Sequence, residues 1–455
     1  MRIERREVRL GELVSIRHGW PFKSEFFSEE RRGRPVVVGI GNFRYTGGFR
    51  FESTTVKEYT GEYPNEYTLR PGDVLLVMTC QTEGGEILGI PGRIPDDGTT
   101  YLHNQRLGKV DVQRADLIDT GFLYWLFLSR EFNQALCATA SGTKIVHTAP
   151  SRIEAFRFAL PPILEQRAIA AVLGAVDGKI DLNRRMNETL EETARVLFKS
   201  WFVDFDPVRA KAEGRRPVGM DAATAALFPD GFEDSEFAEM PKGWSVEPLK
   251  AILSRGSGEI QTGPFGSQLH ASDYQSVGTP VVMPTNVANR RVDETDIARV
   301  SDAHVERLRV HRVRLGDVIY SRRGDVEKHA LVGRAEEGWL CGTGCLRVRP
   351  GSELDPHFLS LWLDLPTSRA WIAARAVGAT MPNLNTQILG QAPVLAVPHA
   401  VQAAFARVMA PIDDRVVAAR EENGALTRLR DYLLPRLLSG EVRVRDAEKL
   451  VGNAT

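Results

Sequence analysis

Two stretches of the chain carry hydrophobic residues at a spacing that alternates between four and three positions. The first covers residues 169–201 and the second covers residues 405–437. A 4-3 spacing sustained over nearly five heptads favours helices that pair through one apolar face. Pro161 and Pro162 precede the first stretch, where proline is compatible with the start of a helix. The pattern therefore predicts two long helices that share a coiled-coil seam.

The seam residues that this spacing predicts fall into two sets. They are Ile169, Leu173, Ile180, Asn187, Leu190 and Leu197 in the first helix, and Ile412, Val416, Asn423, Leu426 and Leu433 in the second. If a pseudo-twofold axis relates the helices, they pair antiparallel, and Asn187 and Asn423 come close together near the middle. Polar residues in a seam can fix its register. The alternative is that both asparagines face solvent.

The chain repeats itself. Leu69-Arg-Pro-Gly-Asp73 returns 244 residues later as Val313-Arg-Leu-Gly-Asp317, and Asn187-Glu-Thr-Leu190 returns 236 residues later as Asn423-Gly-Ala-Leu426. The matches keep the same order in both halves, which indicates a duplication. Short apolar runs separated by Gly, Pro and Asn clusters predict strands before each long helix. Each half is therefore expected to be a mixed α/β domain followed by one helix.

The expected boundaries follow from these patterns. They are residues 1–159 for the first domain, 160–205 for its helix, 206–240 for a linker rich in Gly, Pro and charge, 241–396 for the second domain and 397–445 for the second helix.

Composition narrows the class of protein. The chain has 455 residues, of which 43% are hydrophobic and 26% charged, as in ordinary globular proteins. No apolar run is long enough to span a membrane, and the start of the sequence does not resemble a signal peptide. We therefore expect a cytoplasmic protein. The net charge of −1 weighs against a free-standing, nonspecific nucleic-acid binder, but it does not exclude local basic faces.

The search for catalytic or metal chemistry finds little. Cys341 and Cys345 are spaced like half of a zinc site, but no second Cys or His pair accompanies them. Gly39-Ile-Gly41 follows an apolar run, yet the third glycine of a nucleotide-binding loop is missing, and Phe43 and the residues after it favour continued strand. The sequence also lacks a Walker A motif and an Asn-Pro-Pro-aromatic tetrapeptide. We predict no catalytic residue and no metal ligand.

What remains are polar and basic segments suited to contacts with phosphates and base edges. The alternative for each is a solvated surface, because alternating arginines often lie on an exposed sheet face. The candidates in the first half are Lys23, Ser24, Asn104, Gln105, Arg106, Thr143 and Lys144; those in the second half are Thr262, Gly263, Ser267, Gln268, Arg322, Arg323, Lys328, Asn383 and Asn385.

Several segments resemble the specificity subunits of type I restriction-modification systems. They include Leu160-Pro-Pro-Ile-Leu-Glu-Gln-Arg, Asp177-Gly-Lys-Ile-Asp-Leu-Asn, Leu197-Phe-Lys-Ser-Trp-Phe-Val-Asp-Phe-Asp-Pro, and Leu433-Leu-Pro-Arg-Leu-Leu-Ser-Gly. Thr262-Gly-Pro-Phe-Gly-Ser267 and Pro241-Lys-Gly-Trp244 fit the same family. The resemblance extends over essentially the whole chain.

The resemblance implies two target recognition domains of mixed α/β fold with twisted sheets, separated by two long antiparallel helices. Each domain would read one half of a gapped target in double-stranded DNA. The helices would set the spacing and dock two methyltransferase subunits, with Glu165, Gln166, Gln402 and the seam residues at the docking edges. Val401-Gln402 stands where the first repeat has Glu165-Gln166, so the two edges are expected to differ in strength.

The same resemblance implies that this chain binds no cofactor. S-adenosylmethionine would belong to the methyltransferase partner, and ATP and Mg²⁺ to a restriction subunit. Two rival classes were weighed against this one. An enzyme acting alone would transfer methyl groups as a purified chain, and a coiled-coil scaffold would leave the complex unable to discriminate DNA sequences.

Overall fold

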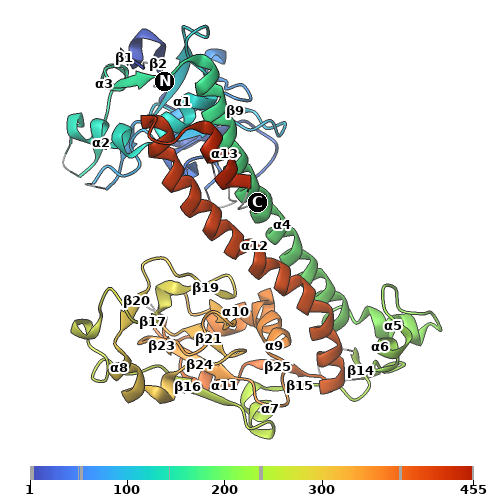
Figure 1. Ribbon diagram of the computed structural model, residues 1–455. Coiled ribbons are helices and arrows are strands. Elements are labelled where there is room, and N and C mark those ends of the chain that lie inside the picture. The colour runs from blue at the N-terminus through green and yellow to red at the C-terminus, as the bar shows by residue number, and fades with distance from the viewer. Residues whose placement is uncertain are drawn as a thin grey trace. The chain divides into compact units, whose positions relative to one another are not determined.

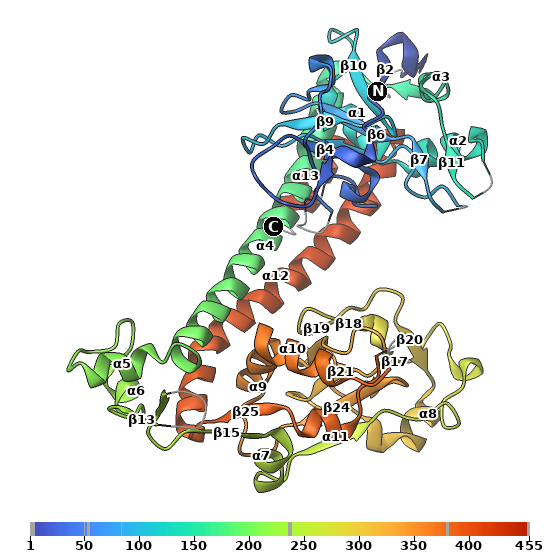
Figure 2. The same cartoon turned by 180° about the vertical axis from the view of Figure 1, so that it is seen from behind.

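The computed structural model describes residues 5–49, 51, 55–82, 84–142, 144–234, 239–378 and 382–452. These residues form two compact units. Unit 1 comprises residues 1–185 and 419–455, and unit 2 comprises residues 186–418. The mixed α/β class predicted from the sequence is confirmed. Each unit joins one α/β domain to the first part of one long helix and the last part of the other, as the green and red helices of Figure 1 and Figure 2 show.

Unit 1 contains two four-stranded sheets. The first has the order β2-β10-β6-β8 and the second the order β3-β5-β4-β9, in which β4 and β9 run parallel. The strands are β2 (Val14–His18), β10 (Leu107–Val112), β6 (Val74–Val77), β8 (Pro91–Arg93), β3 (Phe27–Ser28), β5 (Glu58–Tyr59), β4 (Val36–Val38) and β9 (Tyr101–His103). Two further pairs join β1 (Arg6–Arg9) to β12 (Arg157–Leu160) and β7 (Thr79–Cys80) to β11 (Val146–His147). The helices of the domain are α1 (Thr120–Phe127), α2 (Arg130–Thr139) and α3 (Pro150–Glu154).

Unit 2 repeats this plan. Its four-stranded sheet has the order β16-β24-β21-β22, with β16 (Glu259–Thr262), β24 (Cys345–Arg349), β21 (Val318–Ser321) and β22 (His329–Leu331). Its second sheet has the order β20-β17-β23, with β20 (Ala298–Val300), β17 (Thr279–Val282) and β23 (Leu340–Cys341), and β17 and β23 run parallel like β4 and β9. Smaller pairs are β15 (Ser245–Pro248) with β25 (Pro393–Ala396) and β18 (Val287–Ala288) with β19 (Arg291–Val292). The helices are α7 (Leu249–Arg255), α8 (Asp302–Arg307), α9 (Pro356–Asp364), α10 (Pro366–Arg375) and α11 (Thr386–Gly390).

The long helices are α4 (Ile163–Phe202) and α12 (His399–Ser439), and α13 (Val444–Gly452) follows α12. The heptad pattern largely predicts their buried face, because burial of an apolar stripe is what the spacing reports. The seam residues Ile169, Leu173, Ile180, Val416, Leu426 and Leu433 are buried, whereas Leu190, Leu197, Ile412 and Asn423 are only half-buried. Toward the end of α4, the buried face is aromatic and includes Phe198, Trp201 and Phe202.

Within each unit the two helices run antiparallel. In unit 1, Asp177 pairs with Arg430 at 3.1 Å, and Asn183 donates to the side-chain oxygen of Asn423 at 3.0 Å. In unit 2, Phe198 and Phe202 both pack on Phe405. The partner of Asn423 in unit 1 is therefore Asn183, one turn before the residue that the repeat suggested. Asn187 belongs to unit 2, so its predicted proximity to Asn423 stays a prediction.

A buried glutamine ties the first turn of each long helix to the domain that precedes it. The Gln166 side chain accepts from the Asp119 amide and donates to the carbonyls of Leu117 and Pro161. Gln402 makes the matching bonds to the Asp355 amide and to the carbonyls of Glu353 and Val397.

Both glutamine side chains are buried, at 0% and 1% exposure. Their expected place at a partner-docking edge is therefore wrong: the amide groups are used up inside the chain. Glu165 is half-buried and pairs with Arg5, which also donates to backbone carbonyls at the end of α12.

The segment expected to be a solvated linker is folded in its described part. It contains α5 (Asp206–Ala212), α6 (Ala222–Ala226), and the paired β13 (Phe232–Asp234) and β14 (Glu239–Pro241). Val208 and Phe228 are buried in the core of unit 2 beside Trp201 and Trp244. Apolar residues within a charged stretch thus anchor it to the end of α4.

Three ion pairs attach the second α/β domain to the helices of unit 2. Arg291 pairs with Glu191, Arg195 with Asp364 at 3.5 Å, and His357 of α9 with Asp413 of α12 at 3.0 Å. Burial disfavours the charged form of His357, but the Asp413 carboxylate outweighs burial and raises the pKa of the histidine. Asp355 acts in the same direction, and Arg290 opposes it.

The buried asparagine Asn183 between the long helices leads to a first prediction. Asn183→Ala removes donors to Glu422 and Asn423 and leaves the Asn423 amide poorly satisfied, which costs about 1–3 kcal/mol. We expect the free energy of unfolding, measured by denaturant titration followed by circular dichroism, to fall by this amount. Glu188→Ala, an exposed change on the same helix, is the control. Equal stability of Asn183→Ala and the control would contradict a structural role for the amide.

The histidine anchor makes a second prediction. Because the folded pKa of His357 is raised, its ion pair stabilises unit 2 fully below the unfolded value of about 6.5, and this contribution is lost as pH rises through the folded pKa. His357→Gln should therefore lower the unfolding midpoint at pH 6 more than at pH 8.5. Thermal unfolding at the two pH values measures the difference. A loss that is independent of pH would show that the imidazolium charge does not contribute.

Candidate nucleic-acid interface

In unit 1, several loops converge where strands of the two sheets end. Because β4 and β9 run parallel, their carboxyl ends lie side by side, and residues 39–42 and 104–106 follow them. The Gln105 amide donates to the Trp20 carbonyl at 3.0 Å, and the Met78 amide donates to the Arg106 carbonyl at 3.0 Å. These bonds bring four separate segments to one edge of the domain.

A concave pocket of about 470 Å³ opens at this edge. Its polar lining comes from Lys57, Gln81, Thr82, Asn104 and Arg106. The side chain of Tyr45, which is 58% exposed, also lines it. The mixture of amides, hydroxyls, cations and an exposed aromatic ring suits contacts to the edges of bases and to phosphates.

A hairpin completes the edge in unit 1. Ser141 and His147 exchange two backbone hydrogen bonds, and the Thr148 amide donates to the Met78 carbonyl at 3.0 Å. His147 pairs with Thr79 in the β7–β11 ladder, and the Thr79 hydroxyl lies 3.0 Å from His147 Nδ1.

Unit 2 forms the same backbone bonds with different side chains. The Arg322 amide donates to the Gly344 carbonyl at 2.8 Å, and the Leu384 amide donates to the Arg322 carbonyl at 2.9 Å. Val377 and Asn383 exchange two backbone bonds, as Ser141 and His147 do in unit 1. Asn383 also bridges to Arg323, as His147 pairs with Thr79.

Two further details of this edge are duplicated. A Cβ on Gly19 would lie 2.2 Å from the Asn104 carbonyl oxygen, and one on Gly263 would lie 2.1 Å from the Gly342 oxygen, so both positions require glycine. The loop after β4 is held by the buried Asn42, whose side chain accepts from the Gly39 amide. Asn286 holds the loop after β17 in the same way. The continued strand that Phe43 and the residues after it were expected to form is interrupted, because residues 40–42 form a 3-10 turn around Asn42, and Phe43 then forms an isolated bridge with Phe49.

The structure brings some of the predicted contact residues together. In unit 1 these are Asn104, Gln105 and Arg106, and in unit 2 they are Gly263, Arg322, Arg323 and Asn383. Lys144 lies in the hairpin that ends at His147, and Thr143 lies outside the described residues.

Other predicted contact residues have local structural partners. Asn385 caps α11 by accepting from the Ile388 amide, and Gln268 accepts from the Phe265 amide within its own turn. Lys328 pairs with Asp325, and Thr262 sits in the β16–β24 ladder opposite Leu346. Ser267 immediately precedes Gln268 in the same turn. Lys23 and Ser24 lie at the start of a 3-10 turn, and their side chains have no hydrogen-bond partner in the described part of the chain.

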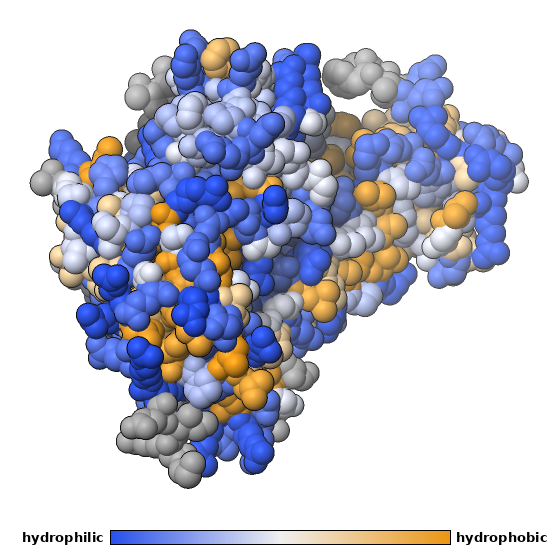
Figure 3. Space-filling model, turned by 90° about the horizontal axis from the view of Figure 1, so that it is seen from above, coloured by the Kyte–Doolittle hydropathy of each residue, from blue (hydrophilic) through white to orange (hydrophobic). Residues whose placement is uncertain are grey.

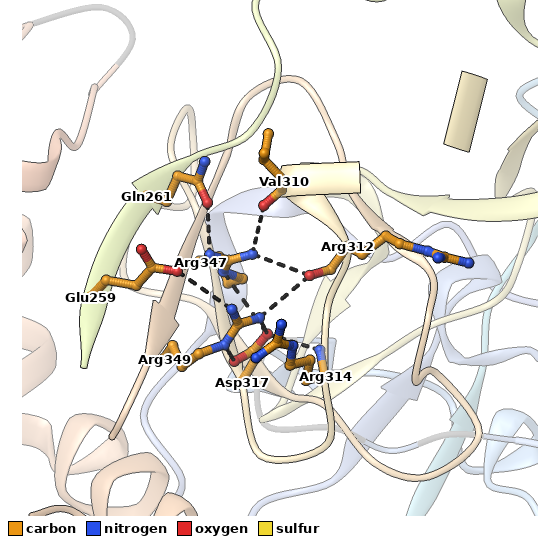
Figure 4. Close-up of polar contacts among 8 residues, drawn as sticks. All are labelled: Glu259, Gln261, Val310, Arg312, Arg314, Asp317, Arg347 and Arg349. Carbon is orange, nitrogen blue, oxygen red and sulfur yellow. Dashed lines mark hydrogen bonds and ion pairs between the residues drawn. The ribbon is translucent and has the colours of Figure 1, made fainter. Parts of the chain in front are cut away.

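Figure 4 shows why part of the basic character of the second domain is internal. Arg347 is buried on β24 and donates to the carbonyls of Val310 and Arg312 and to the side chains of Glu259 and Gln261. Burial, followed by the nearby charge of Arg349, lowers the pKa of Arg347.

Arg349 completes the cluster by binding the buried Asp317 at 2.7 Å, and Asp317 accepts from the Arg314 amide. In unit 1, Lys109 stands at the position of Arg347 and Asp73 at that of Asp317, and the two are 2.7 Å apart. These groups hold sheets and turns together and are not free for an external anion.

The hairpin positions Thr79 and His147 were not among the contact residues predicted from the sequence. Their signal was present, because Ser141 and His147 stand 236 residues before Val377 and Asn383, the same offset that relates the helices. Gly142 and Gly378 are the same residue type at this offset, but the other described positions of the two segments differ, so the backbone bonds reveal the match more clearly than the sequence does.

No group of three or more His, Cys, Asp or Glu side chains in the described residues could hold a metal ion. Cys341 and Cys345 are buried in adjacent strands, and burial raises the pKa of the Cys341 thiol to about 12. No helix in the described part of the chain is long and apolar enough to cross a membrane.

Comparison with known proteins gives concordant results. The family model described as the type I restriction modification DNA specificity domain matches residues 4–192. The HindI specificity subunit of Haemophilus influenzae is 25% identical over 452 residues, covering 90% of this chain and 94% of the relative. The EcoBI specificity subunit of Escherichia coli is 20% identical and covers 96% and 85%.

One solved structure is similar in fold. The S subunit of a type I restriction-modification system from M. genitalium aligns with a TM-score of 0.56 at 15% identity, covering 96% of each chain. Both α/β domains and both long helices of this chain fall within that alignment's span. The matched domain and the relatives that extend over nearly the full length thus make this chain similar to type I restriction-modification specificity subunits, and the solved structure shares its fold.

Proposed function

We propose that this chain is the DNA-reading, non-catalytic subunit of a type I restriction-modification complex. Each α/β domain reads one half of a bipartite, gapped target in double-stranded DNA through the loops at its strand ends. The helices α4 and α12 set the separation of the two half-sites. The complex thereby directs adenine methylation and, with a restriction subunit, DNA cleavage.

One observation carries this proposal. The same backbone hydrogen bonds recur at the strand ends of both domains, while the side chains that they present differ. A backbone geometry that is repeated with different side chains is suited to recognising two different short DNA sequences. Sequence is read by side chains at base edges, whereas backbone groups and phosphate contacts fix position.

The partners of the chain follow from the same proposed function. Two methyltransferase subunits carry S-adenosylmethionine, and restriction subunits use ATP and Mg²⁺. The chain's own Gly39-Ile-Gly41 segment supports this division, because it forms a 3-10 turn around Asn42 and opens no long helix for a nucleotide phosphate. A complex that acts on the host chromosome and on entering DNA works in the cytoplasm.

The long helices also leave apolar side chains exposed. In unit 1 these are Leu164, Leu182 and Tyr432, and in unit 2 they are Val196, Val408 and Val417. Figure 3 shows hydrophobic patches among predominantly hydrophilic residues on one face of the molecule. Exposed apolar residues on paired helices are a natural docking surface for the methyltransferase subunits.

The spacing role is tested by lengthening both helices. One heptad inserted after Arg185 and another after Ala418 adds about 10 Å, which corresponds to about three base pairs of B-DNA. Long-read methylation profiling of cells that carry the chain with its methyltransferase should show a gap longer by about this amount and two unchanged half-sites. An unchanged gap would contradict the ruler role.

The modular reading is tested by exchanging residues 1–155 for the equivalent domain of a relative with another target. The methylated motif should change in one half-site only, since unit 2 keeps its own strand-end loops. A parallel exchange of the second domain is the matched control and should change the other half. A change in both half-sites from either single exchange would contradict independent reading.

A further inference from the structure

A backbone hydrogen bond occurs at equivalent positions in the two domains. It joins the Met78 amide to the Arg106 carbonyl in unit 1 and the Arg322 amide to the Gly344 carbonyl in unit 2. The equivalence is fixed by the strands, because Leu107 faces Val77 in the β6–β10 ladder, and Cys345 faces Ser321 in the β21–β24 ladder. Met78 therefore corresponds to Arg322, and Arg106 corresponds to Gly344.

Each of these residue pairs contains one arginine, but on opposite partners. Unit 1 carries it on the turn between β9 and β10, and unit 2 carries it on the segment that follows β21. The position opposite each arginine holds a residue without charge, Met78 in one case and Gly344 in the other. The two repeats thus each have one arginine in this bonded pair of residues, on different strands.

Both arginines lack an internal anion. Arg106 is exposed and lines the pocket of unit 1, and no carboxylate pairs with it in the described part of the chain. Arg322 is half-buried, and its Nε is a buried donor without a hydrogen-bond partner among the described atoms. By contrast, Arg347 and Arg349 of the same domain are held by Glu259 and Asp317.

A second unpartnered group lies beside Arg322. The buried side-chain oxygen of Asn383 has no hydrogen-bond partner among the described residues, and the backbone of Asn383 bridges to Arg323, which follows Arg322. Buried polar atoms without partners carry a free-energy penalty, so a protein retains them where a ligand supplies the missing partner. Here the donor of Arg322 and the acceptor of Asn383 together match the mixed donors and acceptors of a base edge.

We propose that Arg106 and Arg322 are equivalent base-reading arginines, one for each half of the DNA target, and that Asn383 reads beside Arg322. This inference rests on the proposed function, because it assumes that the strand-end loops face DNA. It adds that Arg106, Arg322 and Asn383 determine specificity. It also adds that the base-contacting arginine lies on one strand of the bonded pair in unit 1 and on the other strand in unit 2. A guanidinium presents two donors to one base in a rigid planar fork, and the flexible ammonium group of lysine does not hold that geometry, so base reading and phosphate contact are separable.

The test uses the full chain in complex with its methyltransferase subunits and a library of randomised DNA duplexes. Bound duplexes are sequenced to obtain the preferred motif of each half-site. The variants are Arg106→Met, Arg322→Met and the charge-preserving Arg106→Lys and Arg322→Lys. Arg322→Met places in unit 2 the residue that unit 1 already accommodates at this point. Arg70→Ala and Arg307→Ala remove exposed arginines elsewhere in the two domains as controls.

We expect Arg106→Met and Arg322→Met each to reduce the preference for the correct base by about tenfold or more, in different half-sites. The half-site of the unaltered domain stays as in the wild type, which also shows that the variant complex is folded. The lysine variants should lose the same preference while keeping most of the total affinity. Asn383→Ala should relax a base in the Arg322 half-site, and the two controls should leave both halves unchanged.

Three other results overturn the inference. If the wild-type complex enriches no sequence, the proposed function fails and the inference fails with it. If the wild type enriches a bipartite motif but the methionine variants preserve it, only the inference fails. If the lysine and the methionine variants both keep the full base preference and differ only in total affinity, the arginines contact phosphate and do not read bases.

Discussion

A buried amide at the first turn of each long helix determines how the helix leaves its domain. Gln166 and Gln402 each satisfy one backbone N–H and two backbone carbonyls that the junction would otherwise bury unpaired. Only a side chain with both a donor and an acceptor, held at one geometry, can do this. The direction of the helix, and with it the face that pairs in the seam, follows from these bonds. The duplicated architecture depends on this junction because each helix contributes to the core of the unit in which it begins.

The sequence predicted the features that have a period. The 4-3 spacing located both helices and most of their buried face, and the offsets of 236 and 244 residues indicated the duplication. It did not reveal that Gln166 is internal or that Asn183 is the partner of Asn423. A polar residue at a seam position indicates only that another group must compensate the free-energy cost of its burial. Which group does so depends on the rotation and stagger of the helices, which side-chain packing sets.

The sequence alone did not show which basic residues are paired internally and which are available to a ligand. The basic residues of the second domain look alike along the chain, yet the structure separates them into two kinds. Arg347 and Arg349 bind Glu259, Asp317 and backbone carbonyls. Arg322, in contrast, has a donor at the strand-end loops that is unpaired within the described part of the chain. An arginine close to a carboxylate in space is a structural crosslink, and one without such a partner can serve a ligand. Since the pairing residues are up to 90 positions apart, no local pattern distinguishes the two cases.

The strand-end frame explains how one fold can serve two recognition tasks. Its geometry depends on backbone hydrogen bonds, on glycines at positions 19 and 263 that no other residue can fill, and on the buried amides of Asn42 and Asn286. None of these requires a particular side chain at the positions that face outward. His147 and Asn383 can therefore replace one another without moving the backbone that carries them, and the buried Met78 of unit 1 has the half-buried Arg322 as its counterpart in unit 2. Recognition can change at these positions while the junction glutamines and the seam remain as they are, because the hydrogen bonds of Gln166 and Gln402 go to backbone groups of the helix junctions and not to the strand-end loops.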